Sequence, residues 1–220
     1  MSFLSSIPFL TTTKDPLQMS STSWQDRELI RDTNTNLFCW RRPSVGKIAE
    51  YLEKLNTYEL ATIRTHVSVE NLAKRLEEHK EAWEQIGAGD SAAFWQDVEM
   101  LVHDFLHFST SREGTVHLKQ LTSTECPRFH VDGYNLRLFT TYVGAGTQWL
   151  PEKGTNRRGL GAGHGKIVKN ESLIKQMDAF EVGILKGEVP NARGSVRGIV
   201  HRSPELVDKS DRRIVLRIDI

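Results

Sequence analysis

The spacing of apolar residues in this 220-residue chain changes near residue 113, and that change restricts the folds that the chain can adopt. Before residue 113, from about residue 44 onward, apolar side chains recur every three or four positions, as on the buried face of a helix. After it, apolar and polar residues alternate in short runs separated by Gly, Pro and Asp-Gly turns, a pattern typical of strands. The chain is therefore predicted to be an α+β protein with a helical N-terminal part.

Three regions follow from this pattern. Residues 1–36 are rich in Ser, Thr and Asp with little periodicity, so we expect a loosely ordered arm. Residues 37–112 are predicted to be mainly helical and to pack on the core, which is formed by residues 113–220. The core has predicted strands at residues 115–122, 128–131, 136–143, 179–186, 197–201 and 213–218. Short strands separated by turns favour a sandwich or a jelly-roll barrel over a parallel α/β sheet.

Three helices are predicted in the second region, after a short strand at residues 36–40. Each has an apolar stripe at helical spacing, and a polar cap or a glycine marks one of its ends. The signals are Ser44 before Ile48, Tyr51, Leu52 and Leu55; Leu72, Leu76 and Trp83 before Gly87; and Asp90 or Ser91 before Phe94, Val98, Leu101, Val102, Phe105 and Phe108.

The composition restricts the binding partners that the protein can have and the cellular compartment in which it is expected. The formal net charge of +1 argues against a nucleic-acid-binding surface built on bulk charge, and no apolar run is long enough to cross a bilayer. Residues 1–10 have no basic n-region, so we expect no secretory signal. Cys39 and Cys126 lie far apart in the sequence, which fits free thiols in a reducing compartment. These features together predict a cytoplasmic protein without membrane or nucleic-acid partners.

The sequence His130-Val131-Asp132 is the strongest sign of chemistry. Alternate residues of a strand point to the same side, so His130 and Asp132 can converge on one point from about 6.5 Å apart along the backbone. With His201, in a later strand-like setting, they make a set of two histidines and one carboxylate. Such a set leaves positions open on an octahedral metal, as a non-haem Fe(II) oxygenase requires.

Longer motifs add a resemblance. The segments CPRFHVD (126–132), 136–138, 141–150 and HRSP (201–204) resemble a bacterial family known only as a domain of unknown function, over roughly residues 37–220. More distantly, the His-x-Asp pair, the later His and an Arg on the last strand are similar to the double-stranded β-helix oxygenases that use Fe(II) and 2-oxoglutarate. This implies a jelly-roll, cupin-like barrel with His130, Asp132 and His201 as metal ligands at the catalytic centre. The bacterial family is associated with metal homeostasis, particularly of zinc.

The same resemblance implies a cosubstrate anchor. In these oxygenases a basic residue on the last strand binds the far carboxylate of 2-oxoglutarate, and here Arg213 follows His201 by twelve residues. A guanidinium suits this role because it makes two parallel charge-assisted bonds to a carboxylate. Arg212 and Arg217 lie close to Arg213 and leave the choice open, and Arg137 is the second candidate.

Other residues give weaker signals. His103 and His107 have the spacing of zinc peptidase ligands, but Asp104 stands where those enzymes have Glu and no third ligand is near. His117 and His164 are weaker ligand candidates. Cys126 shares the strand face of His130 and Asp132, so it is either a soft ligand that favours zinc or a small buried apolar residue.

Residues 144–165 contain seven glycines and are expected to form either a lid or a solvated insertion. The segment lacks the Gly-Lys-Ser/Thr ending of a phosphate-binding loop. As a lid it would bring Arg157 and Arg158 to the mouth of the site, with Trp149 and Tyr142 near the substrate.

Two functions from different classes remain. The first is an Fe(II)- and 2-oxoglutarate-dependent oxygenase of unknown substrate, with Arg213 or Arg137 on the cosubstrate. The second is a non-catalytic metal-binding protein, linked to zinc, with the same three ligands in a cupin-like barrel. A basic side chain that points into the interior near the metal would separate them, because only the first function needs a dicarboxylate.

Overall fold

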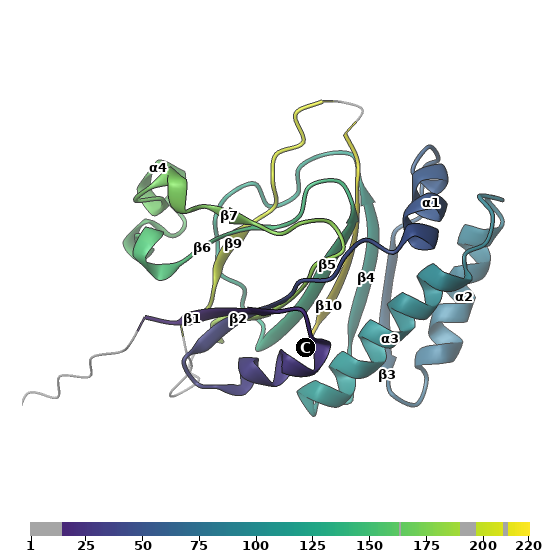
Figure 1. The fold of residues 1–220 in the computed structure, drawn as a ribbon, viewed down its shortest axis with the longest axis horizontal. Coiled ribbons are helices and arrows are strands. Elements are labelled where there is room, and N and C mark those ends of the chain that lie inside the picture. The colour runs from purple at the N-terminus through teal and green to yellow at the C-terminus, as the bar shows by residue number, and fades with distance from the viewer. Residues whose placement is uncertain (1–14, 163, 190–196, 209–210) are drawn as a thin grey trace, which may run out of the picture.

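The computed structural model describes residues 15–162, 164–189, 197–208 and 211–220. It shows a mixed α+β fold in which helices and a smaller sheet pack on one large sheet (Figure 1). The large sheet has seven strands in the order β1-β2-β8-β5-β10-β4-β3, and a second sheet has three in the order β7-β6-β9. The strands are β1 (Leu17–Ser21), β2 (Thr35–Trp40), β3 (Ile63–Ser68), β4 (Glu113–Leu121), β5 (Leu136–Val143), β6 (Gln148–Leu150), β7 (Lys175–Gln176), β8 (Val182–Lys186), β9 (Val200–Arg202) and β10 (Arg213–Asp219). Strand β1 is parallel to β2, and the other pairs in both sheets are antiparallel.

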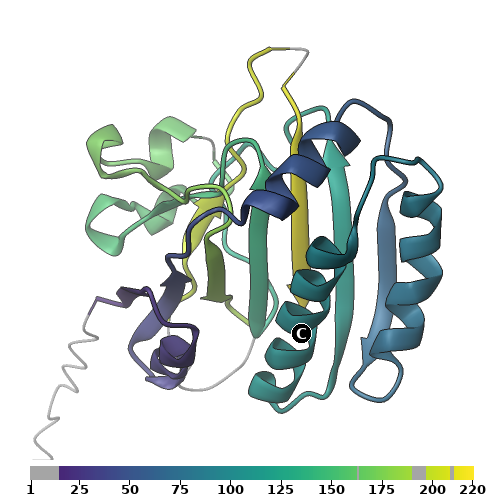
Figure 2. The ribbon, with the colours of Figure 1, turned by 45° about the vertical axis from the view of Figure 1, so that its right-hand side comes forward.

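Three helices cover one face of the large sheet, and the small sheet lies toward its other side (Figures 1 and 2). These helices are α1 (Gly46–Leu55), α2 (Leu72–Glu84) and α3 (Ala92–Ser109). The shorter elements are η1 (Trp24–Arg31), η2 (Glu152–Gly154), η3 (Arg157–Gly159), α4 (His164–Ile167) and η4 (Glu171–Leu173). Among the described residues, no helix is both long and apolar enough to span a membrane.

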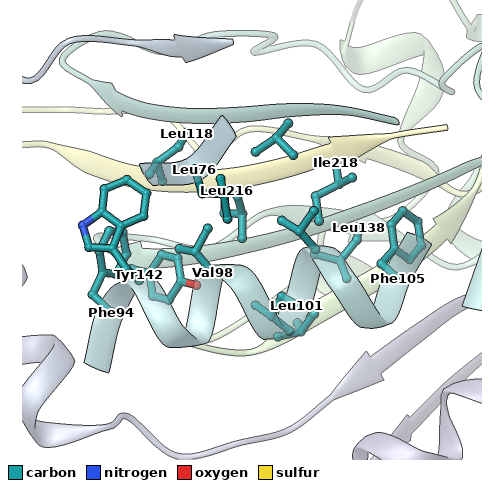
Figure 3. Close-up of a cluster of buried hydrophobic side chains, with 14 of the residues drawn as sticks. Leu76, Phe94, Val98, Leu101, Phe105, Leu118, Leu138, Tyr142, Leu216 and Ile218 are labelled. Carbon is teal, nitrogen blue, oxygen red and sulfur yellow. The ribbon is translucent and has the colours of Figure 1, made fainter. Parts of the chain in front are cut away.

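Side-chain alternation explains why the two faces of the large sheet differ. In β10, Leu216 and Ile218 are fully buried against the helices, while Arg217 between them points the other way, toward the cavity. Helix α3 packs its apolar stripe on this face, and Figure 3 shows Val98 and Phe105 directed toward the strands. The helix-facing side is therefore an apolar core, and the charged residues of β5 and β10 are left for the opposite side.

The sequence predicted most of these elements. Its three helices are confirmed as α1, α2 and α3, and its strands at 36–40, 115–122, 136–143, 179–186 and 213–218 correspond to β2, β4, β5, β8 and β10. The strand expected at 197–201 is the shorter β9. The strand expected at 128–131 is reduced to a single antiparallel bridge between His130 and His201.

The expected boundaries need correction at the N-terminal side. Residues 17–36 are not a loose arm, because β1 pairs with β2 and η1 buries Trp24 and Ile30. Residues 1–14 lie outside the described part of the chain. The region 37–112 contributes β2 and β3 to the sheet in addition to its helices. Strand β1 has no buried residue, so its sequence carried no alternation that would have predicted it.

The expected closed barrel is not observed. Among the described residues the strands form two separate sheets, with β1 and β3 as the edges of the larger one. The physical reason is the size of the second sheet, because β6, β7 and β9 have only three, two and three residues and cannot pair with the whole length of the larger sheet.

Leu101 provides a test of this core. Its side chain is fully buried in the core cluster around α3, so we expect Leu101→Ala to lower the free energy of unfolding by about 2–5 kcal/mol through lost contacts and a cavity. Glu99→Ala, on the exposed side of the same helix, should change it by less than about 0.5 kcal/mol. Urea denaturation of both variants measures the difference. Equal stabilities would contradict the packing described.

Candidate metal centre

His130 and His201 lie directly opposite each other on neighbouring chain segments. The amide N–H of each residue donates to the carbonyl oxygen of the other, at 2.9 Å in both directions. Such a reciprocal pair places two side chains side by side on one face of the ladder. The imidazole rings are accordingly 4.5 Å apart between centroids, although 71 residues separate them along the chain.

Asp132 completes the group from the loop after His130. Its Oδ1 is 3.6 Å from His130 Nε2, and its Oδ2 is 3.3 Å from His201 Nε2. The backbone of the loop is held by Glu188, whose N–H donates to the Asp132 carbonyl at 2.8 Å. Gly187 allows this close approach, because a Cβ there would lie 2.4 Å from the same carbonyl oxygen.

The three donors fit a divalent metal ion. One ligand atom from each residue lies within 4.8 Å of the others, and this is the only such group found among the described residues. Two ligands about 2.1 Å from a metal and at right angles lie about 3 Å apart, close to the separations observed here. Each histidine also has its Nδ1 near a backbone carbonyl: His130 at 2.9 Å from Arg128, and His201 at 3.2 Å from Ile199. An N–H at Nδ1 leaves the Nε2 lone pair free for a metal.

The electrostatics of the group favour a cation between the ligands. The hydrogen bond with Asp132 raises the pKa of His130. Burial by itself would raise the pKa of Asp132, but the hydrogen bonds from His130 and His201 and the charge of Arg137 hold it well below its usual range. Asp132 is thus an ionised, buried ligand at neutral pH, as metal coordination requires.

Arg137 connects the candidate ligand Asp132 to the last strand. Its Nη1 donates to Asp132 Oδ2 and its Nε donates to Asp219 Oδ1, both at 2.6 Å, and all three side chains are buried. Asp219 also lies 3.4 Å from His117 Nε2 and 3.1 Å from Arg217 Nη2. Burial alone would raise the pKa of Asp219, but these neighbours lower it. Arg137 is therefore occupied by two protein carboxylates.

Arg213 has a different environment. Its side chain is 2% exposed, its Nε donates to the Ala145 carbonyl at 2.6 Å, and its Nη2 donates to Thr141 Oγ1 at 3.2 Å. Among the described residues, no carboxylate forms an ion pair with it, and burial lowers its pKa to about 10 despite the opposing charge of Glu125. Gly144 lets the chain fold closely over this side chain, because a Cβ there would lie 2.9 Å from Arg213 Cγ.

One cavity joins these groups. His130, His201, Arg137 and Arg213 all line it, and strands β4, β5 and β10 form its floor. Leu216 and the other residues that alternate with Arg213 face the helices instead. The arrangement places a three-donor metal site around the same space as a buried guanidinium that, in the described part of the chain, forms no ion pair with a carboxylate.

Several sequence candidates lie elsewhere or have other roles. Cys126 lines the cavity but is exposed, and it is neither part of the donor group nor a buried apolar residue as the sequence suggested. His103 and His107 lie 4.4 Å apart between ring centroids on the outer face of α3. They belong to no group of three donors in the described part of the chain. The side chain of His164 lies outside the described residues.

The expected lid is a folded segment. Residues 144–165 include β6, η2 and η3, and Arg157 binds Glu152, Glu188 and the Gly198 carbonyl, so it fixes the segment and does not line the cavity. Trp149 packs on a separate apolar cluster. Tyr142 was also misplaced by the sequence reading, because its side chain points to the helix core and its hydroxyl donates to Asp97 at 2.6 Å.

Asp219 was missed by the sequence reading. It shares the face of Arg213 and Arg217 at every second position of the last strand, which was the available signal. Its pairing with Arg137, 82 residues earlier in the chain, could not be read from local spacing.

Comparison with known proteins gives a family and a fold. A family model described as a protein of unknown function (DUF1826) matches residues 21–219, and no curated protein matches the sequence. The dioxygenase for auxin oxidation 1 from Arabidopsis thaliana, solved with 2-oxoglutarate, aligns with a TM-score of 0.50 at 8% identity over 94% of this chain and 92% of that chain. The dioxygenase for auxin oxidation from rice aligns with a TM-score of 0.51 at 11% identity over 94% of this chain and 82% of that chain. At such identities the likeness concerns the fold alone.

Replacement of the candidate ligands tests the metal centre. We expect His130→Ala, His201→Ala and Asp132→Ala each to abolish stoichiometric metal binding while the fold survives, because two donors cannot hold the ion. The double variant His103→Ala/His107→Ala removes a histidine pair from α3 and should keep full metal content. Elemental analysis and circular dichroism are the measurements. Full metal content in any two of the single variants would refute the assignment.

Arg137 provides a second test. We expect Arg137→Gln to weaken metal binding by about 10- to 100-fold, because Asp132 loses the guanidinium that orients it. Competition with a chelator of known affinity measures the change, and Arg128→Gln, an exposed arginine nearby, is the control. Unchanged metal affinity in Arg137→Gln would show that this contact does not support the metal.

Proposed function

The chain belongs to the DUF1826 family of proteins of unknown function, and we propose that it is a non-haem Fe(II)- and 2-oxoglutarate-dependent oxygenase. The observation that carries the proposal is the placement of the His130, Asp132 and His201 donors and the buried Arg213 around one cavity. A non-catalytic metal site needs the three donors but has no use for a buried guanidinium without a carboxylate partner. The two sheets correspond, in this proposal, to the walls of an open double-stranded β-helix.

The fold supports this proposal without deciding it. Both plant proteins that share the fold are described as dioxygenases, and one of them was solved with 2-oxoglutarate. Fe(II), held by His130, Asp132 and His201, would supply the open coordination positions and the redox chemistry for O₂. Zinc is the alternative metal, because two imidazoles and a carboxylate also suit it.

Each protein group has a defined task in this reaction. Arg213 binds and orients the far carboxylate of 2-oxoglutarate, which offers a counter-charge to a guanidinium that has no carboxylate ion pair among the described residues. Arg137 fixes Asp132 in its ionised, coordinating position and so keeps the ligand set in place between turnovers. The carbonyls of Arg128 and Ile199 hold the two imidazoles with Nε2 toward the metal position. Phe139 and Val215 provide apolar surface in the cavity, which limits the water around the reacting atoms.

Arg213 decides between an enzyme and a metal-binding module. We expect Arg213→Ala to leave metal content intact but to weaken 2-oxoglutarate binding by about 2 kcal/mol or more, roughly thirtyfold, because the carboxylate loses its paired donor in a partly dry pocket. Arg213→Lys should recover only part of this loss, since an ammonium lacks the planar fork. The measurement is the visible charge-transfer band of the anaerobic Fe(II)–2-oxoglutarate complex, titrated in each variant.

Two comparisons make the result interpretable. Arg75→Ala, on the exposed surface of α2, controls for a general loss of positive charge. Arg137→Ala, measured at saturating Fe(II) because its metal binding is expected to be weaker, shows whether the anchor is there instead, in which case the band disappears although the metal is bound. If the wild-type protein gives neither the band nor turnover of 2-oxoglutarate, the oxygenase proposal fails and a zinc-linked metal-binding function becomes the better account.

A further inference from the structure

The cavity contains more positive charge than its metal site and cosubstrate anchor use. Its lining includes five basic side chains and one carboxylate: Lys119, Arg137, Arg202, Arg213, Arg217 and Glu125. Lys119 lies 3.3 Å from Glu125, and Arg137 lies between Asp132 and Asp219. Of the other arginines, Arg213 has no carboxylate ion pair among the described residues and Arg217 shares one carboxylate with Arg137, and a low-dielectric cavity makes such uncompensated charge costly without an anionic ligand.

Arg217 is only partly compensated by a carboxylate. Its Nη2 lies 3.1 Å from Asp219 Oδ2, but the other oxygen of that carboxylate is already bound by Arg137 at 2.6 Å. His117 Nε2 is also 3.1 Å from Arg217 Nη2. The Nε of Arg217 and the Nδ1 of His117 are buried and have no hydrogen-bond partner among the described residues. One carboxylate thus serves two guanidiniums and an imidazole, and the cluster keeps unused donor capacity.

The strand pairing shows which residues lie on either side of Arg217 across the sheet. Strand pairing places Arg64 of β3, His117 of β4, Arg217 of β10 and Phe139 of β5 in one row across the sheet. Arg64 is exposed at the edge strand, and Phe139 is an apolar wall of the cavity. The side chain of Arg217 is 30% exposed, so it is reachable from the cavity, whereas Arg213 is buried on the same strand four residues before it.

We infer that Arg217, together with His117, binds the anionic group of the substrate, and that the substrate is a small organic acid or phosphate ester with an apolar body that lies on Phe139. This inference rests on the proposed function only where it calls the ligand a substrate. A guanidinium beside an imidazole offers several N–H donors to a carboxylate or phosphate, and these charge-assisted bonds are stronger than those to a neutral group. Arg213 and Arg217 would then bind two different anions, the cosubstrate and the substrate.

Isothermal titration of the full-length Zn(II)-loaded protein with and without saturating 2-oxoglutarate tests the inference. Benzoate and phenyl phosphate are the anionic probes and distinguish a carboxylate from a phosphate ligand, and benzamide is the neutral match. We expect one of the anions to bind at least about tenfold more tightly than benzamide. Arg217→Met should remove that advantage, and Arg217→Lys should restore part of it because the charge returns. Arg75→Met, on the exposed face of α2, is the matched control, and circular dichroism verifies the fold of each variant.

The outcomes separate this inference from the proposed function. If wild-type protein does not bind 2-oxoglutarate but binds an anionic probe in an Arg217-dependent manner, the oxygenase proposal fails and the anion site stands. If Arg217→Met loses 2-oxoglutarate while Arg213→Met retains it, Arg217 is the cosubstrate anchor and the inference is wrong. It is also wrong if benzamide binds as tightly as both anions, if no probe binds, or if Arg217→Met and Arg75→Met bind the probes equally.

Discussion

Buried charge on one face of the central strands is the constraint on which the site depends. Strands β5 and β10 must place alternate residues against the helices, so Arg137 and Asp219 are forced into the opposite, partly closed side. Burial of such groups is tolerated only when they are paired. The contacts of Arg137 with Asp132 and Asp219, both at 2.6 Å, satisfy this requirement and connect the last strand to a candidate metal ligand.

This pairing couples the fold to the proposed chemistry. The strands that carry Arg137 and Asp219 are the same ones that α3 packs against from the other side, so the helix core supports the sheet beneath the metal centre. His130 and His201 are fixed by a reciprocal backbone bridge. A site supported in this way has its ligand geometry determined before any ion binds, which is what effective coordination and catalysis require.

Two arginines on the last strand, Arg213 and Arg217, differ in burial and in their carboxylate partners, and this difference favours different ligands. Arg213 is buried without a carboxylate partner, and Arg217 is partly exposed and shares Asp219 with Arg137 and His117. In the proposed reaction, the first environment suits an anion that occupies the site in every cycle. The second suits an anion that enters and leaves through the accessible part of the cavity. The proposed assignment of cosubstrate and substrate follows from this difference in burial.

Local spacing determined a large part of this protein. The change of period near residue 113 predicted the α+β class, the three helices and most central strands, because periodicity reports which residues one element must bury. The His-x-Asp spacing and the later His201 predicted the three donors that the structure brings within 4.8 Å of one another.

Only the tertiary structure decided what depends on long-range pairing. It placed Tyr142 in the helix core and bound Arg157 to Glu152, Glu188 and the Gly198 carbonyl. It also added the edge strands β1 and β3 and divided the strands between two sheets. It also paired Arg137 with Asp219 and thereby left Arg213 as the better candidate for the cosubstrate. Sequence periodicity states that a face is buried, but the partner that buries it comes from another part of the chain. That partner determines whether a charged side chain supports the structure or remains available to a ligand.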